Sequence, residues 1–146
     1  MINRRALVAV TGAALLVLPQ TGSTQVPVTK RRIGFLSAFP RASIDAFLSE
    51  LRPELDKLGW TDGRNIELLE PRTTDGKNER LHSAAAEVIS LRPDLILVQT
   101  VPATRALIQA TKSIPVVMVG VATPVELGLI ADYAKPGGNV TGTRVC

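Results

Sequence analysis

The hydrophobic pattern of this chain changes repeatedly between the period of a strand and the period of a helix, and this alternation constrains the fold most. The short apolar runs that predict buried strands are 32–37, 64–70, 95–99 and 116–121, and 140–144 begins a fifth. The segments with helical spacing that follow the strands are 43–58, 78–91, 102–111 and 126–133. The pattern predicts an α/β fold with a doubly wound parallel sheet.

Local signals refine these elements. Ser43 is a plausible N-cap of the first helix, Pro53 should kink that helix, and Gly59 ends it. Pro102 suits the first turn of the third helix. The run 95–99 is apolar almost throughout, as expected of a strand covered by helices on both faces.

The connections of such a sheet are right-handed, and five strands most often take the order 2-1-3-4-5. Ligands bind where this order reverses, at the carboxyl ends of the first and third strands. The loops that border this crevice are 37–42 and 100–104, with 122–124 beside them. The sequence therefore predicts a candidate ligand site formed by three loops.

The common catalytic uses of this fold are disfavoured. The first loop contains no glycine and no phosphate-binding P-loop occurs, so nucleotide cofactors are not expected. Neither Ser37 nor Gln99-Thr100 supplies the acids of a magnesium-binding receiver domain. His82 is the only histidine and no G-x-S-x-G motif is present, so a nucleophile with its base is hard to build. We expect no catalytic residues, no metal site and no cofactor.

The cysteine content and the charge pattern disfavour a disulfide-stabilised fold and a nucleic-acid-binding protein. Cys146 is the only cysteine, so the fold must be stable without an internal disulfide. The formal net charge is +4, but Arg4 and Arg5 contribute to it from an N-terminal segment that is expected to be removed. Elsewhere the bases alternate with acids except at Lys30-Arg31-Arg32, and aromatic residues make up only 3%. Nucleic acid is therefore not an expected partner.

The N-terminus has the layout of a secretory signal peptide. The basic residues Arg4 and Arg5 precede the apolar run 6–18, and 19–25 is polar with small side chains. The apolar run is shorter than the roughly 20 residues of a membrane span. We expect a signal peptide at 1–25, a flexible linker at 26–31, a lobe at 32–146, and an exported, periplasmic or otherwise extracytoplasmic protein.

The crevice loops offer hydroxyl groups and the free backbone amides of helix starts, near Ser43 and Ala103. Such donors suit a carboxylate or another small anion. The alternative for Ser43 is that it only caps its own helix.

Several motifs carry a family resemblance. They are RIGFLS, LDKLGWTDGRNIELLE, the run from LRPDLILVQT to PGGNVTG, and within that run T-K-x-I-P-V-V and A-x-P-G-G-N-V-T-G. Together they span roughly 31–142, and the chain resembles the substrate-binding proteins of ABC transporters, in particular tryptophan and tyrosine uptake components. The resemblance implies a type I periplasmic binding fold, in which two α/β lobes close on a small solute and the closed form docks on a membrane permease. It implies no catalysis and a monomer at full length.

The chain also departs from that family. Its members are about twice as long, so the resemblance implies a single N-terminal lobe, from a fragment or a truncated gene product, that binds solute poorly alone. The loop that often reads D-P-V is Thr123-Pro124-Val125 here, which removes a partner for a ligand ammonium group. Val101 is bulkier than the residue usual in the third-strand loop.

The site that the resemblance implies has three parts. Hydroxyls and backbone amides would hold a carboxylate, and Phe39 and Pro102 would add apolar contacts. The predicted ligand-binding residues are Ser37, Ala38 and Phe39 of the first loop, Thr100, Pro102, Ala103 and Thr104 of the second, and Ala122 and Thr123 of the third. The alternative function is a fragment of an exported α/β enzyme, or a signalling module, whose active residues lie elsewhere.

Overall fold

A computed structural model describes residues 29–142 of the chain. The predicted signal peptide, the linker up to residue 28, and residues 143–146 with Cys146 lie outside this range. The strands are β1 (Arg31–Ser37), β2 (Ile66–Leu68), β3 (Arg72–Thr73), β4 (Leu95–Val98), β5 (Val116–Met118) and β6 (Val140–Gly142). The helices are α2 (Arg41–Lys57), the 3-10 turn η1 (Asn78–Arg80), α3 (Leu81–Ser90) and α4 (Val101–Ala110).

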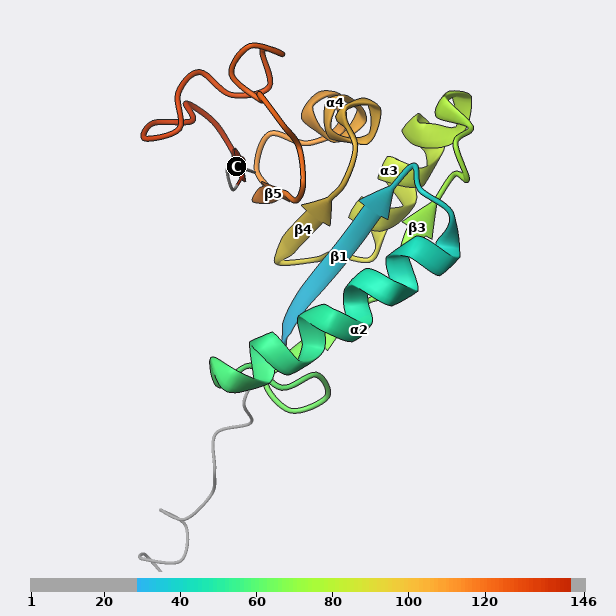
Figure 1. Cartoon of the computed structure of the whole chain (residues 1–146), viewed down its shortest axis with the longest axis vertical. Helices are drawn as coiled ribbons and strands as arrows, with labels where there is room; N and C mark the ends of the chain where they lie inside the picture. Colours follow the sequence, from blue (N-terminus) through green and yellow to red (C-terminus); the bar gives the residue numbers. More distant parts are fainter. Residues whose placement is uncertain (1–28, 143–146) are drawn as a thin grey trace, which may run out of the picture.

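The strands form one parallel sheet in the order β2-β1-β4-β5-β6, and β3 also pairs with β1 (Figure 1). Counted as the sequence predicted them, this order is 2-1-3-4-5, so the doubly wound fold is confirmed. The predicted second strand, 64–70, corresponds to β2, and a further short strand that was not predicted, β3, follows it. Pro71, which separates them, has no N–H to donate to a strand ladder.

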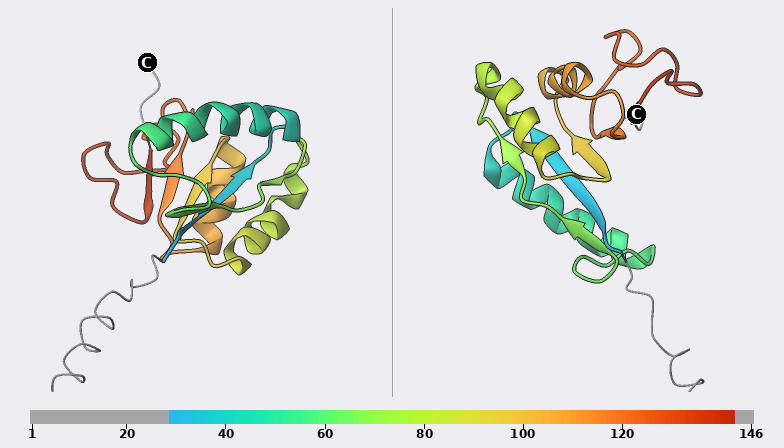
Figure 2. Two further views of the ribbon diagram at one scale, coloured as in Figure 1. Left: turned by 90° about the horizontal axis from the view of Figure 1, so that it is seen from below. Right: turned by 180° about the vertical axis from the view of Figure 1, so that it is seen from behind.

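Helices cover both faces of the sheet, with α2 on one face and α3 and α4 on the other (Figure 2). Alternate strand residues point to opposite faces. Leu36, Val98 and Met118 belong to the large core cluster together with apolar residues of α3 and α4. Phe35 belongs to a smaller cluster with Ile44 and Leu48 of α2. The parallel sheet is thus more fully covered on the α3 and α4 face.

Helix α3 approaches β1 closely at Gly34. A Cβ atom added to Gly34 would lie 2.8 Å from Val88 Cγ1. This spacing is shorter than real carbon contacts, so the position requires a residue without a side chain. The contact fixes how α3 lies on the sheet.

One local prediction was wrong at the first helix. Pro40, not Ser43, is the N-cap residue of α2, and its carbonyl accepts a hydrogen bond from Ser43 N at 3.0 Å. Proline suits this position because its own φ is fixed, here at −58°. Pro53 lies inside the 17-residue helix, as expected, and the kink there stays a prediction.

The predicted helix at 126–133 is also wrong, because this segment forms turns. Leu129 N donates to Pro124 O at 2.9 Å, and Gly128 N donates to Val125 O at 3.0 Å. Gly128 has a φ of +70°. A residue in this left-handed region ends a helix, so the apolar spacing here reports a buried turn rather than a helical face.

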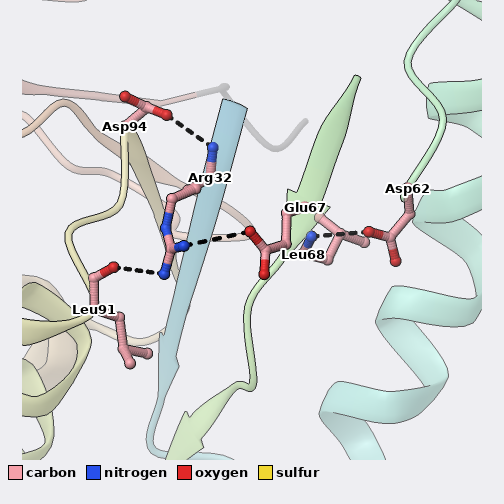
Figure 3. Close-up of polar contacts among 6 residues, drawn as sticks. All are labelled: Arg32, Asp62, Glu67, Leu68, Leu91 and Asp94. Atoms are coloured by element: carbon pink, nitrogen blue, oxygen red, sulfur yellow. Dashed lines mark hydrogen bonds and ion pairs between the residues drawn. The ribbon is translucent and has the colours of Figure 1, made fainter. Parts of the chain in front are cut away.

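Contacts of Arg32 connect several elements at the amino edge of the sheet, where the strands begin (Figure 3). The Arg32 N–H donates to Asp94 Oδ2 at 2.8 Å, and Asp94 N donates to Arg32 O at 2.7 Å. The Arg32 guanidinium donates to Leu91 O at 2.8 Å and to Glu67 Oε2 at 3.4 Å. The Arg32 side chain therefore connects β1 with β2 and with the end of α3, and the Arg32 backbone connects β1 with the start of β4.

An apolar hollow of about 400 Å³ lies at this same amino edge, between α2 and the sheet. It is lined by Ile33, Leu55, Ile66 and Leu95, with Trp60 beside them. A second hollow, of about 520 Å³, lies between the end of α4 and the turns that precede β6. The first hollow lies at the opposite edge of the sheet from the loops of the predicted ligand site. The second adjoins the third of these loops, because Leu129, which lines it, donates to Pro124 O.

Candidate functional site

The parallel register brings the three predicted loops to one edge of the sheet, which we call the carboxyl edge. Leu36, the residue before the last one of β1, is paired with Val98, the last residue of β4. Val98 is in turn paired with Met118, the last residue of β5. Beyond these pairs, Gln99 N donates to Leu36 O at 3.1 Å and Val119 N to Val98 O at 2.9 Å. The chain segments after β1, β4 and β5 therefore start side by side.

The first loop is fixed by its own hydrogen bonds. The Ser37 hydroxyl accepts from Phe39 N at 3.0 Å and donates to Gln99 Oε1 at 3.4 Å, and Ser37 is fully buried. Ala38 is half-buried and packs against the large core cluster. Phe39 is 48% exposed. Of the three predicted residues in this loop, Phe39 is the one whose side chain is open to solvent.

The second loop is strained at Thr100. This residue precedes α4 with φ of +76° and ψ of 146°, a region that β-branched residues rarely adopt. Its carbonyl accepts from Thr104 N at 3.1 Å and from Thr104 Oγ1 at 2.8 Å. Its own hydroxyl oxygen is shielded from solvent and has no hydrogen-bond partner within residues 29–142. Thr100 therefore combines backbone strain with an unused polar group.

The first turn of α4 has one side exposed to solvent and one side buried in the core. Pro102 is exposed, whereas Ala103 and Thr104 are fully buried. The Thr104 hydroxyl is used within its own helix, as described above. The first amides of an α-helix have no partner inside the helix, so the start of α4 still offers donors to an anion.

The third loop is the most open. Ala122 and Thr123 are both exposed, and Thr123 has a φ of +51°. Its carbonyl accepts from Leu127 N at 3.1 Å. The structure thus brings all three loops to one edge, with Phe39, Pro102, Ala122 and Thr123 outermost. Contact of any of the nine predicted residues with a solute stays a prediction.

Sequence reasoning missed a fourth loop at this edge, which follows β3. Gly76 N donates to Ala38 O at 2.7 Å, and Thr74 N donates to Ser37 O at 3.3 Å. The Thr73 hydroxyl donates to Phe39 O. These bonds attach the loop to the first predicted loop. The signal that could have found it is Asp75-Gly76, a common turn dipeptide, after Pro71.

Backbone strain is concentrated at the carboxyl edge. Among residues 29–142, the non-glycine residues with positive φ are Asp75, Arg92, Thr100 and Thr123. Three of these four lie in loops that follow β3, β4 and β5, and Arg92 lies before β4. Strained conformations are often found at ligand sites, where the surrounding structure holds them in place.

The charges near this edge are mostly paired. Arg41, the first residue of α2, donates to Asp45 Oδ1 at 2.8 Å and to Glu70 Oε1 at 2.5 Å. The hydrogen bonds to Asp45 and then to Glu70 raise the pKa of the Arg41 guanidinium above its usual value. This cation is therefore already occupied by two carboxylates.

No group of three or more His, Cys, Asp or Glu side chains between residues 29 and 142 is arranged to hold a metal ion. No helix in the same range is long and apolar enough to cross a membrane.

A doubly wound parallel lobe with strained, hydroxyl-bearing loops at its carboxyl edge defines a ligand-binding α/β protein. The family described as ABC transporter substrate binding protein matches residues 33–144, and the chain belongs to this family. The family resemblance read from the sequence is thereby confirmed.

Relatives with known structures or curated names are longer proteins. The chain is 33% identical over 114 residues to a tyrosine-binding protein of Clostridioides difficile, covering 78% of this chain and 33% of that protein. It superposes on a Streptococcus pneumonia ABC domain in complex with L-Trp with a TM-score of 0.70 and 27% identity, covering 80% of this chain and 39% of the other. It also resembles the ligand-free, open structure of a Clostridium difficile substrate binding protein with adhesive properties, at 32% identity and a TM-score of 0.68, covering 78% of this chain and 38% of the other. The chain thus spans about a third of the length of these relatives.

Proposed function

We propose that this lobe forms one wall of the cleft in which an ABC uptake transporter's binding protein captures a small solute, such as an amino acid or another small carboxylate. The family, and relatives that carry tyrosine or tryptophan in their names, support this proposal. In the complete binding unit a second lobe closes over the solute because the closed state makes the better contacts. The closed form then delivers the solute to a membrane permease.

The observation that carries the proposal is the conformation of Thr100. Its unpaired hydroxyl, its positive φ and the start of α4 coincide at the middle of the carboxyl edge. A rotation about χ1 would turn the hydroxyl towards a solute carboxylate that is held by the first amides of α4. Phe39 lies on the neighbouring loop with its ring half exposed and would contact the apolar part of the solute.

We propose binding without catalysis. The relative with a curated name is a binding protein rather than an enzyme. The Ser37 hydroxyl donates to the Gln99 side-chain amide, which cannot act as a base, and His82 is exposed near the start of α3. The enzyme alternative therefore has no observation in its favour.

Location and partners follow from the same family. ABC substrate-binding proteins are typically extracytoplasmic, and the basic and apolar N-terminal pattern supports export by a signal peptide. The partners in this proposal are the solute and the permease, with no nucleic acid, and the unit acts as a monomer.

The test is a ¹H–¹⁵N NMR titration of the chain without residues 1–25, at millimolar concentrations of L-tryptophan, L-tyrosine and, as a control, glucose. The expected result is that amide signals from 37–39, 99–104 and 119–123 shift with either amino acid. Replacing Thr100 with Val keeps the shape and removes the hydroxyl, so it should weaken binding about tenfold, as expected for one hydrogen bond to a charged group. Signals that move only at the amino edge, or do not move at all, would contradict the proposal.

A further inference from the structure

We propose that Asp75 receives the positively charged group of the solute and so makes the site selective for solutes with an ammonium group. This inference rests on the proposed function. It assigns a role to the loop after β3, residues 73–76, which we call the β3 loop. The three predicted loops contain no acidic residue, and Thr123 is uncharged, so they do not account for how an ammonium group would be held.

The β3 loop is held in place by hydrogen bonds to the first predicted loop. Thr74 N and Gly76 N donate to the carbonyls of Ser37 and Ala38, and the Thr73 hydroxyl donates to the carbonyl of Phe39. Within the loop, Asp75 N donates to Thr73 Oγ1 at 3.2 Å. Because Phe39 is itself a predicted contact of the solute, the β3 loop lies directly beside the candidate site.

The conformation of the loop exposes Asp75 while its neighbours anchor it. Asp75 has φ of +49° and Gly76 has φ of +84°, so the chain reverses sharply here. Thr74 is only 4% exposed, and its hydroxyl oxygen has no hydrogen-bond partner in the described part of the chain. A buried hydroxyl without a partner is uncommon in folded proteins, so the Thr74 hydroxyl remains available to a water or a solute beside the loop.

The Asp75 carboxylate is the available negative charge at this edge. It is exposed, and it makes no hydrogen bond or ion pair within residues 29–142. It is also the one acidic residue in the segments that directly follow β1, β3, β4 and β5, namely 38–40, 74–77, 99–100 and 119–123. The nearby acids Asp45 and Glu70 are both paired with Arg41.

The topology of the sheet places the β3 loop and the start of α4 on opposite sides of the end of β1. Both β3 and β4 pair with β1, one on each side of it. Two strand spacings separate them by about 10 Å, and the side chains that follow them can extend towards each other over the end of β1. A zwitterionic amino acid in this gap would direct its carboxylate to Thr100 and α4 and its ammonium group to Asp75.

The experiment compares two probes on three proteins by the NMR titration described above. The probes are L-tryptophan and indole-3-propionate, which lacks the ammonium group. The proteins are the unsubstituted chain, Asp75→Asn, and the matched control Glu79→Gln, which removes the same charge from an exposed position on η1. Asparagine tolerates positive φ as aspartate does, so Asp75→Asn should keep the loop conformation.

We expect Asp75→Asn to weaken L-tryptophan binding about three- to fivefold, the size expected of one exposed ion pair, and to leave indole-3-propionate unchanged. Glu79→Gln should change neither. Equal affinities of Asp75→Asn and the unsubstituted chain for L-tryptophan would overturn this inference alone, as would an equal loss in Glu79→Gln. If neither probe binds the unsubstituted chain, the proposed function fails and the role of Asp75 fails with it.

Discussion

The two edges of the sheet differ in how completely their polar groups are used. At the amino edge, Arg32 bonds to three other segments, and only its Nε lacks a partner among the described residues. At the carboxyl edge, the hydroxyls of Thr74 and Thr100 have no hydrogen-bond partner among residues 29–142, and three loops contain positive φ. This difference supports the proposal that the carboxyl edge contacts a solute, while the amino edge maintains the fold.

The largest effect should come from removing the connections of the amino edge. Replacing Arg32 with Met keeps the aliphatic stem but removes the bonds to Leu91 and Glu67. We expect a loss of about 2 kcal/mol in the free energy of unfolding, because hydrogen bonds of charged groups contribute about 1.5–3 kcal/mol. Urea unfolding followed by circular dichroism measures it.

Arg31→Met is the matched control for this variant, since Arg31 is exposed and no side-chain bond of it is found in the described range. Its unfolding free energy should change by less than about 0.5 kcal/mol. Equal losses of unfolding free energy in the two variants would show that the positive charge of Arg32, and not its hydrogen bonds, stabilises the fold.

Relief of backbone strain at the carboxyl edge should raise the free energy of unfolding instead of lowering it. Thr100→Gly removes a conformational cost of about 1–3 kcal/mol and adds a glycine entropy cost of about 0.5–1 kcal/mol. We expect the lobe to become about 1 kcal/mol more stable in the same urea assay. Thr100→Ala, which loses the same hydroxyl but keeps the strained φ, should not be stabilised, and a Thr100→Ala variant as stable as Thr100→Gly would refute the strain.

A smaller gain in the free energy of unfolding is expected from Thr123→Gly. Its φ of +51° lies in the ordinary left-handed region, which costs a non-glycine residue about 1–2 kcal/mol. After the glycine entropy cost, Thr123→Gly should be more stable by about 0.5 kcal/mol. A destabilised Thr123→Gly variant would mean that the Thr123 side chain makes a favourable contact.

The smallest effect is that of a solute on the melting temperature. Stabilisation by a ligand grows only when its concentration exceeds the dissociation constant, and a single wall should bind in the millimolar range or weaker. We expect L-tryptophan at a few millimolar to raise the melting temperature of the lobe by less than about 1 °C. A shift of several degrees in a thermal-shift assay would show that this lobe encloses the solute by itself.

Most of the fold followed from the sequence because strands and helices bury apolar residues with different periods. The strand order was predicted correctly, and α4 starts one residue before the predicted Pro102. The segment 126–133 was predicted as a helix, whereas the structure forms turns there and Gly128 has a φ of +70°. Apolar periodicity indicates which residues are buried. It does not reveal that the backbone of Gly128 takes a left-handed conformation.

Less of the candidate site could be predicted. The edge itself follows from topology, since parallel strands end on the same side. Whether a hydroxyl is available depends on contacts between segments distant in sequence. The Ser37 hydroxyl is bonded to Gln99, 62 residues away, whereas the Thr100 hydroxyl has no partner within residues 29–142. The β3 loop was missed because the predicted strand ended at residue 70, whereas a further short strand, β3, follows Pro71 and leads the chain to the edge.

The hollow at the amino edge has a practical consequence for optical experiments. Trp60 is the only tryptophan of the chain, and it lines this hollow with 45% of its surface exposed. Its emission spectrum therefore reports the packing of α2 against β1 and β2. A solute arriving at the opposite edge would leave the indole environment unchanged, so fluorescence quenching would record no binding even when the site is occupied.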